Sequence, residues 1–193
     1  FRRVLFRSKY MESIKVISYQ KIIKYFLIVF LGSILLAISA KIKIPFYPVP
    51  MTMQTFVVVF IGLAFGWKIG VATILLYLME GIIGLPVFAG TPEKGLGLAY
   101  FMGPTMGYLV GFIFATFLAG YFSLKKNIFF IFLKLIASVS LIYIFGILWL
   151  GNLIGWDKPI IELGLKPFLL AELFKVSLLT ILTKKIIKFR KFI

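Results

Sequence analysis

The chain of 193 residues contains no cysteine and no histidine. Without cysteine it can form neither disulfides nor thiolate metal sites. Without histidine it lacks the commonest metal ligand and the side chain that most readily exchanges protons near neutral pH. Acidic residues are also scarce, numbering six in the whole chain. Because so few groups remain for chemistry, we expect no catalytic residues, no metal site and no cofactor.

The sequence also lacks the polar surface that a soluble domain needs. Hydrophobic residues make up 62% of the chain and aromatic residues 18%. The mean hydropathy of +1.08 is far above that of soluble globular domains. The length suits one compact helical membrane domain. We therefore predict an all-α integral membrane protein whose single domain spans residues 11–193.

Basic residues outnumber acidic ones, and the formal net charge is +16. Such a charge would suit a nucleic-acid-binding protein, but here the lysines flank the apolar runs and form no stripe interleaved with aromatic residues. Flanking lysines are what the positive-inside rule produces in membrane proteins. We therefore expect the chain to contact a lipid bilayer and not nucleic acid.

The first eight residues, "FRRVLFRS", differ in composition from the rest of the chain. They carry three of its four arginines, whereas lysine dominates after Ser8. A codon sequence that encodes them matches the end of a common sequencing adapter. A basic signal-peptide start is the alternative, but no small-residue cleavage site precedes Glu12. We expect residues 1–8 to be a sequencing artefact and the natural start to be Met11 or slightly upstream.

The apolar runs predict six membrane-spanning helices. The second and third are short, and at 1.5 Å per residue each reaches only about 22 Å. A hydrocarbon core is about 30 Å thick, so longer neighbours must shield these two helices or the bilayer must thin around them. We expect a tight turn between them at residues 66–68. The six predicted segments are 22–40, 52–66, 69–83, 104–123, 128–151 and 167–183.

The distribution of basic residues predicts the orientation of these helices. With six spans, the N-terminus, the 66–68 turn, the 124–127 loop and the C-terminal tail share one side. From Lys9 onward that side carries twelve basic residues, against five on the other. The positive-inside rule then places both termini in the cytoplasm. The connection at 41–56 and the loop at 84–103 are expected to face outward.

Two charged residues interrupt the last apolar run. Glu172 and Lys175 are three residues apart and therefore share one helix face. Charges inside a membrane helix are costly and usually functional, and the lysine offers a donor to an anionic group. The alternative is that the pair only neutralises itself. Glu80, near the outer end of the third helix, fits either an interfacial position or contact with a ligand.

Small residues in the first helix indicate close helix packing. Ser33 and Ala37 have the four-residue spacing that lets another helix approach. The chain also contains no GxxxxGK[ST] phosphate-binding loop, the motif with which many ATPases bind ATP. If the chain takes part in pumping a solute, the ATPase must therefore be another chain.

Four motifs occur in a fixed order between Ser33 and Leu179, a region that covers most of the chain. Together they resemble the BioY family, the biotin-specific substrate-binding (S) subunits of energy-coupling-factor (ECF) transporters. The resemblance implies a six-helix cup that opens outward, with biotin below the loop that joins the first two helices. The motifs are "VPMTMQT" (49–55), "GIIGLPVFAG" (81–90), "GPTMGYLVGF" (103–112) and "LKPFLLAELFKVSL" (165–178).

The resemblance also implies site residues. The last helix of the family usually reads Gly-Asp-x-x-Lys after Pro-Phe; Lys175 matches the lysine, while Ala171 and Glu172 replace Gly-Asp. Glutamate keeps the charge with one more methylene. Biotin combines an apolar bicycle with a ureido group and a carboxylate, so its site needs apolar walls and a few polar groups. Which end of biotin meets which residue stays open. The candidate substrate-binding residues are Thr52, Gln54, Glu80, Tyr100, Tyr108, Glu172 and Lys175, although packing at helix ends would equally explain Gln54 and the two tyrosines.

The family resemblance implies partners as well. Small residues on the first helix, here Ser33, Ala37 and Ala40, are expected to dock onto a membrane coupling subunit that is driven by two cytoplasmic ATPases. The expected location is a bacterial or archaeal cell membrane. Two alternatives stay open: an S subunit for another vitamin, such as thiamin or riboflavin, and a membrane protein that does not transport.

The connection "KIKIPFYPVPMTMQTF" (41–56) is expected to be a lid over the biotin site. Proline fixes φ and has no N–H donor, so Pro45, Pro48 and Pro50 favour an extended segment over a helix. Such a segment can cross the mouth of a cup without burying unpaired donors. Phe46 and Tyr47 are expected to supply its apolar underside.

Overall fold

The computed structural model describes the backbone of residues 2–44, 47–122 and 127–192, and the side chains of these ranges apart from 2–18 and 192. The described chain is mostly helical, as predicted. A two-stranded antiparallel hairpin, in which Lys43 pairs with Thr52, contains its only strands. The α-helices are α1 (Arg2–Lys41), α2 (Gln54–Ile82), α3 (Leu98–Phe101), α4 (Met106–Tyr121), α5 (Ile128–Ile154), α6 (Ile160–Gly164) and α7 (Leu169–Ile186). The strands are β1 (Lys43–Ile44) and β2 (Met51–Thr52), and two 3-10 helices, η1 and η2, cover Lys166–Phe168 and Ile187–Phe192.

Helix α2 consists of two arms that meet at Gly66. This glycine has φ 75° and ψ 172°, a conformation that residues with a Cβ rarely adopt. The turn expected at residues 66–68 is therefore present. The arms approach each other closely, because a Cβ added to Gly70 would lie 3.3 Å from the Cα of Gly62.

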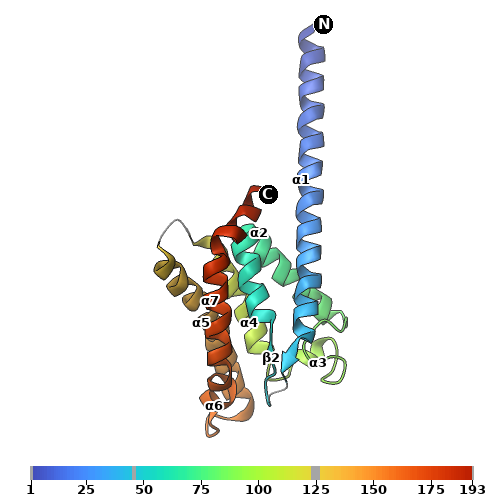
Figure 1. Ribbon diagram of the computed structural model, residues 1–193. Coiled ribbons are helices and arrows are strands. Elements are labelled where there is room, and N and C mark those ends of the chain that lie inside the picture. The colour runs from blue at the N-terminus through green and yellow to red at the C-terminus, as the bar shows by residue number, and fades with distance from the viewer. Residues whose placement is uncertain (1, 45–46, 123–126, 193) are drawn as a thin grey trace.

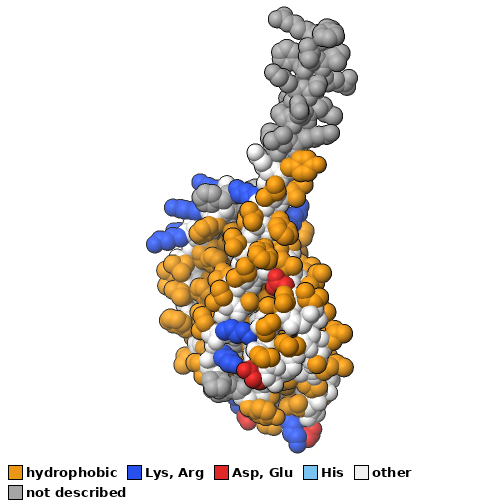
Figure 2. Space-filling view, turned by 90° about the vertical axis from the view of Figure 1, so that its right-hand side faces the viewer, with side chains coloured by type: hydrophobic (Ala, Val, Ile, Leu, Met, Phe, Trp, Pro, Cys, Tyr) orange, Lys and Arg blue, Asp and Glu red, His pale blue; other side chains and the backbone are white. Residues whose placement is uncertain are grey.

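The helices differ in length and in hydropathy, which decide whether a helix can cross a membrane. Among the described residues, three helical segments are long and apolar enough to cross a membrane, namely Tyr19–Lys41, Gln54–Ile82 and Ile128–Ile154, and α4 is a shorter apolar helix. Many large hydrophobic side chains point outward, including Phe26, which is 64% exposed. Hydrophobic side chains also cover most of the face in Figure 2. An apolar exterior of this extent suits a lipid environment.

The core lies between α2, α4, α5 and α7, whereas α1 stands at the edge of the bundle (Figure 1). Helix α4 packs closely on α5, because a Cβ on Gly111 would lie 2.6 Å from the Cα of Ile142. Helix α1 packs on α2, where Gly32 faces Thr73. Its N-terminal part extends well beyond the other helices. The chain then leaves α1 through the β1–β2 hairpin, which lies beside the N-terminal end of α2.

Candidate binding site

A cavity lies beneath the β1–β2 hairpin, where segments far apart in the sequence meet. It encloses about 500 Å³ of space unoccupied by atoms, including its open mouth. The hairpin segment, the start of α2, α4, α5 and α7 all contribute to its walls. Most of the wall is apolar, as binding of a compact organic molecule requires. The polar lining residues are Thr52, Gln54, Thr55, Tyr100, Thr105, Tyr108, Tyr143 and Glu172.

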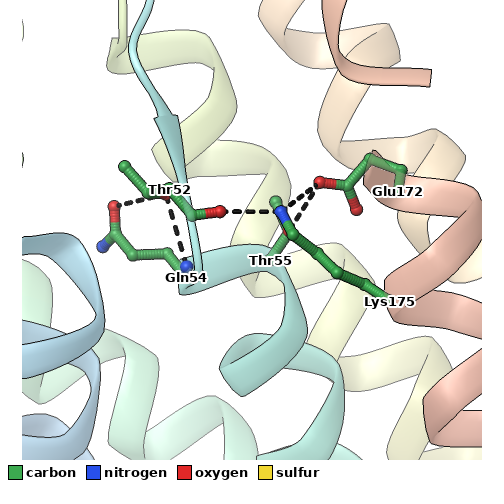
Figure 3. Close-up of polar contacts among 5 residues, drawn as sticks. All are labelled: Thr52, Gln54, Thr55, Glu172 and Lys175. Atoms are coloured by element: carbon green, nitrogen blue, oxygen red, sulfur yellow. Dashed lines mark hydrogen bonds and ion pairs between the residues drawn. The ribbon is translucent and has the colours of Figure 1, made fainter. Parts of the chain in front are cut away.

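A buried network joins α7 to the hairpin and to α2 (Figure 3). Lys175 Nζ donates to the backbone oxygen of Thr52 at 2.7 Å, to Thr55 Oγ1 at 3.0 Å and to Glu172 Oε1 at 2.8 Å. Thr55 Oγ1 donates in turn to Glu172 Oε1 at 2.7 Å. An ammonium group has three protons, so these contacts use the full donor capacity of Lys175.

Burial of both charged groups makes this ion pair costly in free energy, because each charge loses its hydration. The side chains of Lys175 and Glu172 are only 7% and 9% exposed. A buried ion pair is tolerated only if further hydrogen bonds replace the water that both charges have lost. Lys175 obtains them from Thr52 and Thr55. The adjacent i,i+3 positions on α7 therefore bring the charges together, but residues of the hairpin and α2 make the pair tolerable.

One oxygen of the pair is not satisfied. Glu172 Oε2 is buried and has no hydrogen-bond partner among the described residues, although the phenol of Tyr143 on α5 lies near this carboxylate. An unpaired buried acceptor costs about 1–3 kcal/mol, and more when charged. Since Glu172 also lines the cavity, a hydrogen-bond donor on a ligand would satisfy this oxygen.

A second chain of hydrogen bonds starts at Gln54. Its Nε2 donates to Tyr77 Oη at 2.7 Å, and Tyr77 Oη donates to the backbone oxygen of Val87 at 3.0 Å. Gln54 therefore lines the cavity, and through Tyr77 its amide group helps to hold the loop that contains Val87 against α2. Its contact with a substrate stays a prediction, and its amide nitrogen already donates to Tyr77.

The two tyrosines predicted for the site line the cavity with their rings. Tyr100 Oη donates to the backbone oxygen of Ala89 at 2.8 Å, and Tyr108 Oη to that of Gly164 at 2.8 Å. Burial raises the pKa of Tyr100, which keeps this hydroxyl protonated as a donor. The hydroxyls thus hold loops in place, and the rings supply apolar wall.

The segment predicted to be the lid lies over the cavity, but Val49 and not Tyr47 is on its inner side. Pro48 and Val49 are buried, and Val49 and Pro50 line the cavity. Tyr47 is 88% exposed and points away, so its assignment to the apolar underside needs correction. Residues 47–49 form bends instead of a regular strand, which turns Tyr47 outward and Val49 inward. The other two predicted lid residues, Pro45 and Phe46, lie outside the described residues.

Glu80 lies outside the cavity and instead contacts helix α1. Its Oε1 accepts a hydrogen bond of 2.8 Å from Ser33 Oγ on α1. Ser33 and Ala40 are fully buried and Ala37 is partly buried. The docking face expected from these three residues is therefore not open, because their small side chains allow close packing within the chain itself.

Three of the polar lining residues, Thr55, Thr105 and Tyr143, were not predicted. Thr55 is the last residue of the "VPMTMQT" motif, so its signal was present. Tyr143 is the only tyrosine in the long apolar run of α5, and a phenol hydroxyl there could have indicated a role.

Several known proteins are similar to this chain. A sequence model of the BioY family matches residues 11–192. The chain is 36% identical to a probable biotin transporter BioY of Pyrococcus horikoshii over 79% of this chain and 89% of the relative. It is 34% identical to the biotin transporter BioY of Thermotoga maritima, over 80% and 90%.

A solved structure shares the fold. The crystal structure of the S-component for biotin from an ECF-type ABC transporter superposes with a TM-score of 0.73. The match covers 88% of this chain and 93% of the other, at 24% identity. The family model matches nearly the whole chain, and the relatives match most of it. These findings show that the chain is a multi-pass membrane protein that belongs to the BioY family.

Proposed function

We propose that this chain is the biotin-binding S subunit of an ECF transporter and captures biotin for uptake into the cell. Its relatives are named biotin transporters. The observation that carries the proposal is Glu172 Oε2, a buried carboxylate oxygen without a hydrogen-bond partner among the described residues, at the wall of an apolar cavity. It identifies the kind of ligand group that the cavity needs, namely a hydrogen-bond donor.

Biotin matches these requirements. Its ureido N–H can donate to Glu172 Oε2 in a charge-assisted hydrogen bond. Its apolar bicycle would pack against the wall formed by Tyr108 and Tyr143, whose rings contact each other edge to face with centroids 5.9 Å apart. Since Lys175 already uses its three protons, we assign it to positioning Glu172 and the lid. The valerate would then point toward the mouth beneath Val49.

The proposed topology has six membrane segments, formed by α1, the two arms of α2, α4, α5 and α7. Their lysine-rich ends favour cytoplasmic termini. The lid and the cavity would then face outward, where biotin is captured. We keep residues 11–193 as a single membrane domain in this proposal.

Transport in this scheme needs other chains. The sequence contains no phosphate-binding loop, so ATP hydrolysis would belong to two cytoplasmic ATPases joined by a membrane coupling subunit. We place the assembly in the cell membrane of a bacterium or archaeon. Biotin is its transported substrate, and no catalytic step is assigned to the chain.

Isothermal titration of the purified protein with biotin tests this function. We expect heat of binding for biotin and none for thiamin or riboflavin. Glu172→Gln should weaken biotin binding at least tenfold, about 1.4 kcal/mol, because the acceptor loses its charge while the shape is kept. Glu162→Gln is the matched control, since Glu162 lies on the exposed α6 and pairs with Lys166.

Two results would contradict the proposal. A signal for thiamin or riboflavin but not for biotin would make the chain an S subunit for another vitamin. Unchanged biotin affinity in Glu172→Gln would remove Glu172 from the ligand contacts and leave it as the partner of Lys175 only.

A further inference from the structure

A second hollow lies at the opposite end of the bundle from the biotin cavity. It opens between α1 and the Gly66 turn of α2 and encloses about 990 Å³, including space open to the surroundings. Tyr25, Val29, Phe65, Ile69 and Ala72 give it apolar walls. We call it the turn groove. Nothing in the proposed biotin site uses it.

Two cations line this apolar groove. Lys68 and Arg190 both contribute to its wall, and among the described side chains neither pairs with a carboxylate. Lys21 lies four residues before Tyr25, and Tyr25 four before Val29, so these positions share one face of α1. Three basic residues therefore lie around the same end of the groove. Figure 2 shows basic side chains gathered toward the upper end of the described surface.

Arg190 is only partly compensated. Its Nε donates to the backbone oxygen of Leu63 at 2.9 Å, and its Nη2 to those of Gly62 at 3.3 Å and Gly120 at 3.1 Å. These carbonyls end the first arm of α2 and helix α4, where the helix dipoles are negative. Burial lowers the pKa of the guanidinium, which reflects lost hydration. No hydrogen bond of Nη1 is present among the described residues.

Trp67 indicates where the groove lies relative to a membrane. Its ring meets Phe117 edge to face at 5.4 Å, and Lys68 Nζ lies 5.6 Å from its centroid. Tryptophan and lysine together are typical of the membrane–water interface. The cations would then lie at headgroup level, and the apolar walls at Val29, Ile69 and Ala72 at the level of acyl chains.

From this combination we propose that the turn groove binds one anionic phospholipid. Its phosphate lies between Lys21, Lys68 and Arg190, and an acyl chain lies along the apolar walls formed by α1 and α2. The charge complementarity selects an anionic lipid over a zwitterionic one, since the net charge of the groove is positive. The bound lipid ties α1 to α2 and α4 at the end remote from the biotin cavity.

Native mass spectrometry of protein taken from nanodiscs of mixed phosphatidylglycerol and phosphatidylcholine tests this site. We expect one retained phosphatidylglycerol per chain. Lys68→Gln should lower the apparent affinity for phosphatidylglycerol about fivefold, which is the contribution of one basic residue near an anionic surface. Lys184→Gln is the matched control, because Lys184 is exposed near the same end and does not line the groove.

A steric variant separates the groove from general surface charge. Ala72→Leu fills the wall without changing charge and should reduce lipid retention, while biotin affinity stays unchanged because the cavity is at the other end. Equal retention of the two lipids, or equal loss in Lys68→Gln and Lys184→Gln, would overturn the site.

The groove's occupant can also be distinguished from a protein. The chain has no native cysteine, so Ala72→Cys gives a single thiol for maleimide labelling. We expect phosphatidylglycerol to slow this labelling more than phosphatidylcholine. Protection by the coupling subunit alone, with no effect of phosphatidylglycerol, would overturn the lipid site and assign the groove to a protein contact. Titration with biotin on the same samples keeps this test separate from the proposed transport function.

Discussion

At the scale of single residues, Lys175 and Glu172 have different roles although they share a helix face. Sequence reasoning treats both as candidates for contact with a ligand. In the structure Lys175 Nζ donates its three hydrogen bonds to Thr52, Thr55 and Glu172. Glu172 keeps one oxygen without a hydrogen-bond partner among the described residues. The carboxylate is therefore the better candidate for direct contact, and the lysine holds it in place.

Lys175→Ala should damage both stability and binding. It leaves the Glu172 charge buried without its cation, which costs about 3 kcal/mol, and we expect a lower melting temperature and at least tenfold weaker biotin binding. Thermal unfolding and titration in the same detergent measure the two effects. In the matched control Lys166→Ala, an exposed ion pair is lost, and both quantities should hardly change. Unchanged biotin affinity in the Lys175→Ala variant would show that the lysine is dispensable for the site.

At the scale of elements, the hairpin between α1 and α2 lies over the cavity, and its role as a lid is a proposal that depends on the side chains it turns inward. Val49 is buried at 6% exposure and lines the cavity, whereas Tyr47 is 88% exposed. Lys175 also holds the backbone of Thr52 in β2. The hairpin is therefore held over the cavity by the buried side chain of Val49 and by the hydrogen bond from the Lys175 ammonium to Thr52.

Val49→Ala should speed the release of biotin. Losing two buried methyl groups weakens the contact between lid and cavity by about 1 kcal/mol, so the dissociation rate should rise severalfold. Tyr47→Ala, a larger truncation on the exposed side, should leave the rate unchanged. Stopped-flow displacement of a fluorescent biotin analogue measures both. Equal rates in all three proteins would reduce the hairpin to a linker.

At the scale of the whole molecule, the bundle has two unlike ends. One end carries the hairpin and the cavity proposed to bind biotin, and the other carries the Gly66 turn, Arg190 and the turn groove. Helix α1 runs along the edge between them (Figure 1). Its Ser33–Glu80 hydrogen bond joins it to α2. A polar bond of this kind inside an apolar helix pair fixes how the two helices are aligned.

The absence of cysteine allows a direct test of orientation. Tyr47→Cys, on the lid, should react with a membrane-impermeant maleimide added to intact cells. Lys185→Cys, exposed at the end of α7, should react only after the membrane is opened. Labelling of Lys185→Cys in intact cells would contradict cytoplasmic termini and reverse the proposed topology.

Composition and pattern alone determined much about this protein. High hydropathy, flanking lysines and four ordered motifs sufficed to predict a helical membrane protein of the BioY family, because these signals are local and additive along the chain. Glycine at position 66 likewise predicted the turn inside α2. The pairing of Glu172 with Lys175 follows from helical spacing in the same way.

Only the tertiary structure decided how the charges and lid residues are used. Thr55 and Tyr143 reach Glu172 from other helices, and contacts across such distances in sequence leave no local pattern. Bends at 47–49 turn Val49 toward the cavity and Tyr47, expected on the apolar underside, away from it. Ser33 bonds Glu80 instead of facing a partner subunit. Each outcome depends on which side chain faces which neighbour, and that is set by how the helices pack against one another.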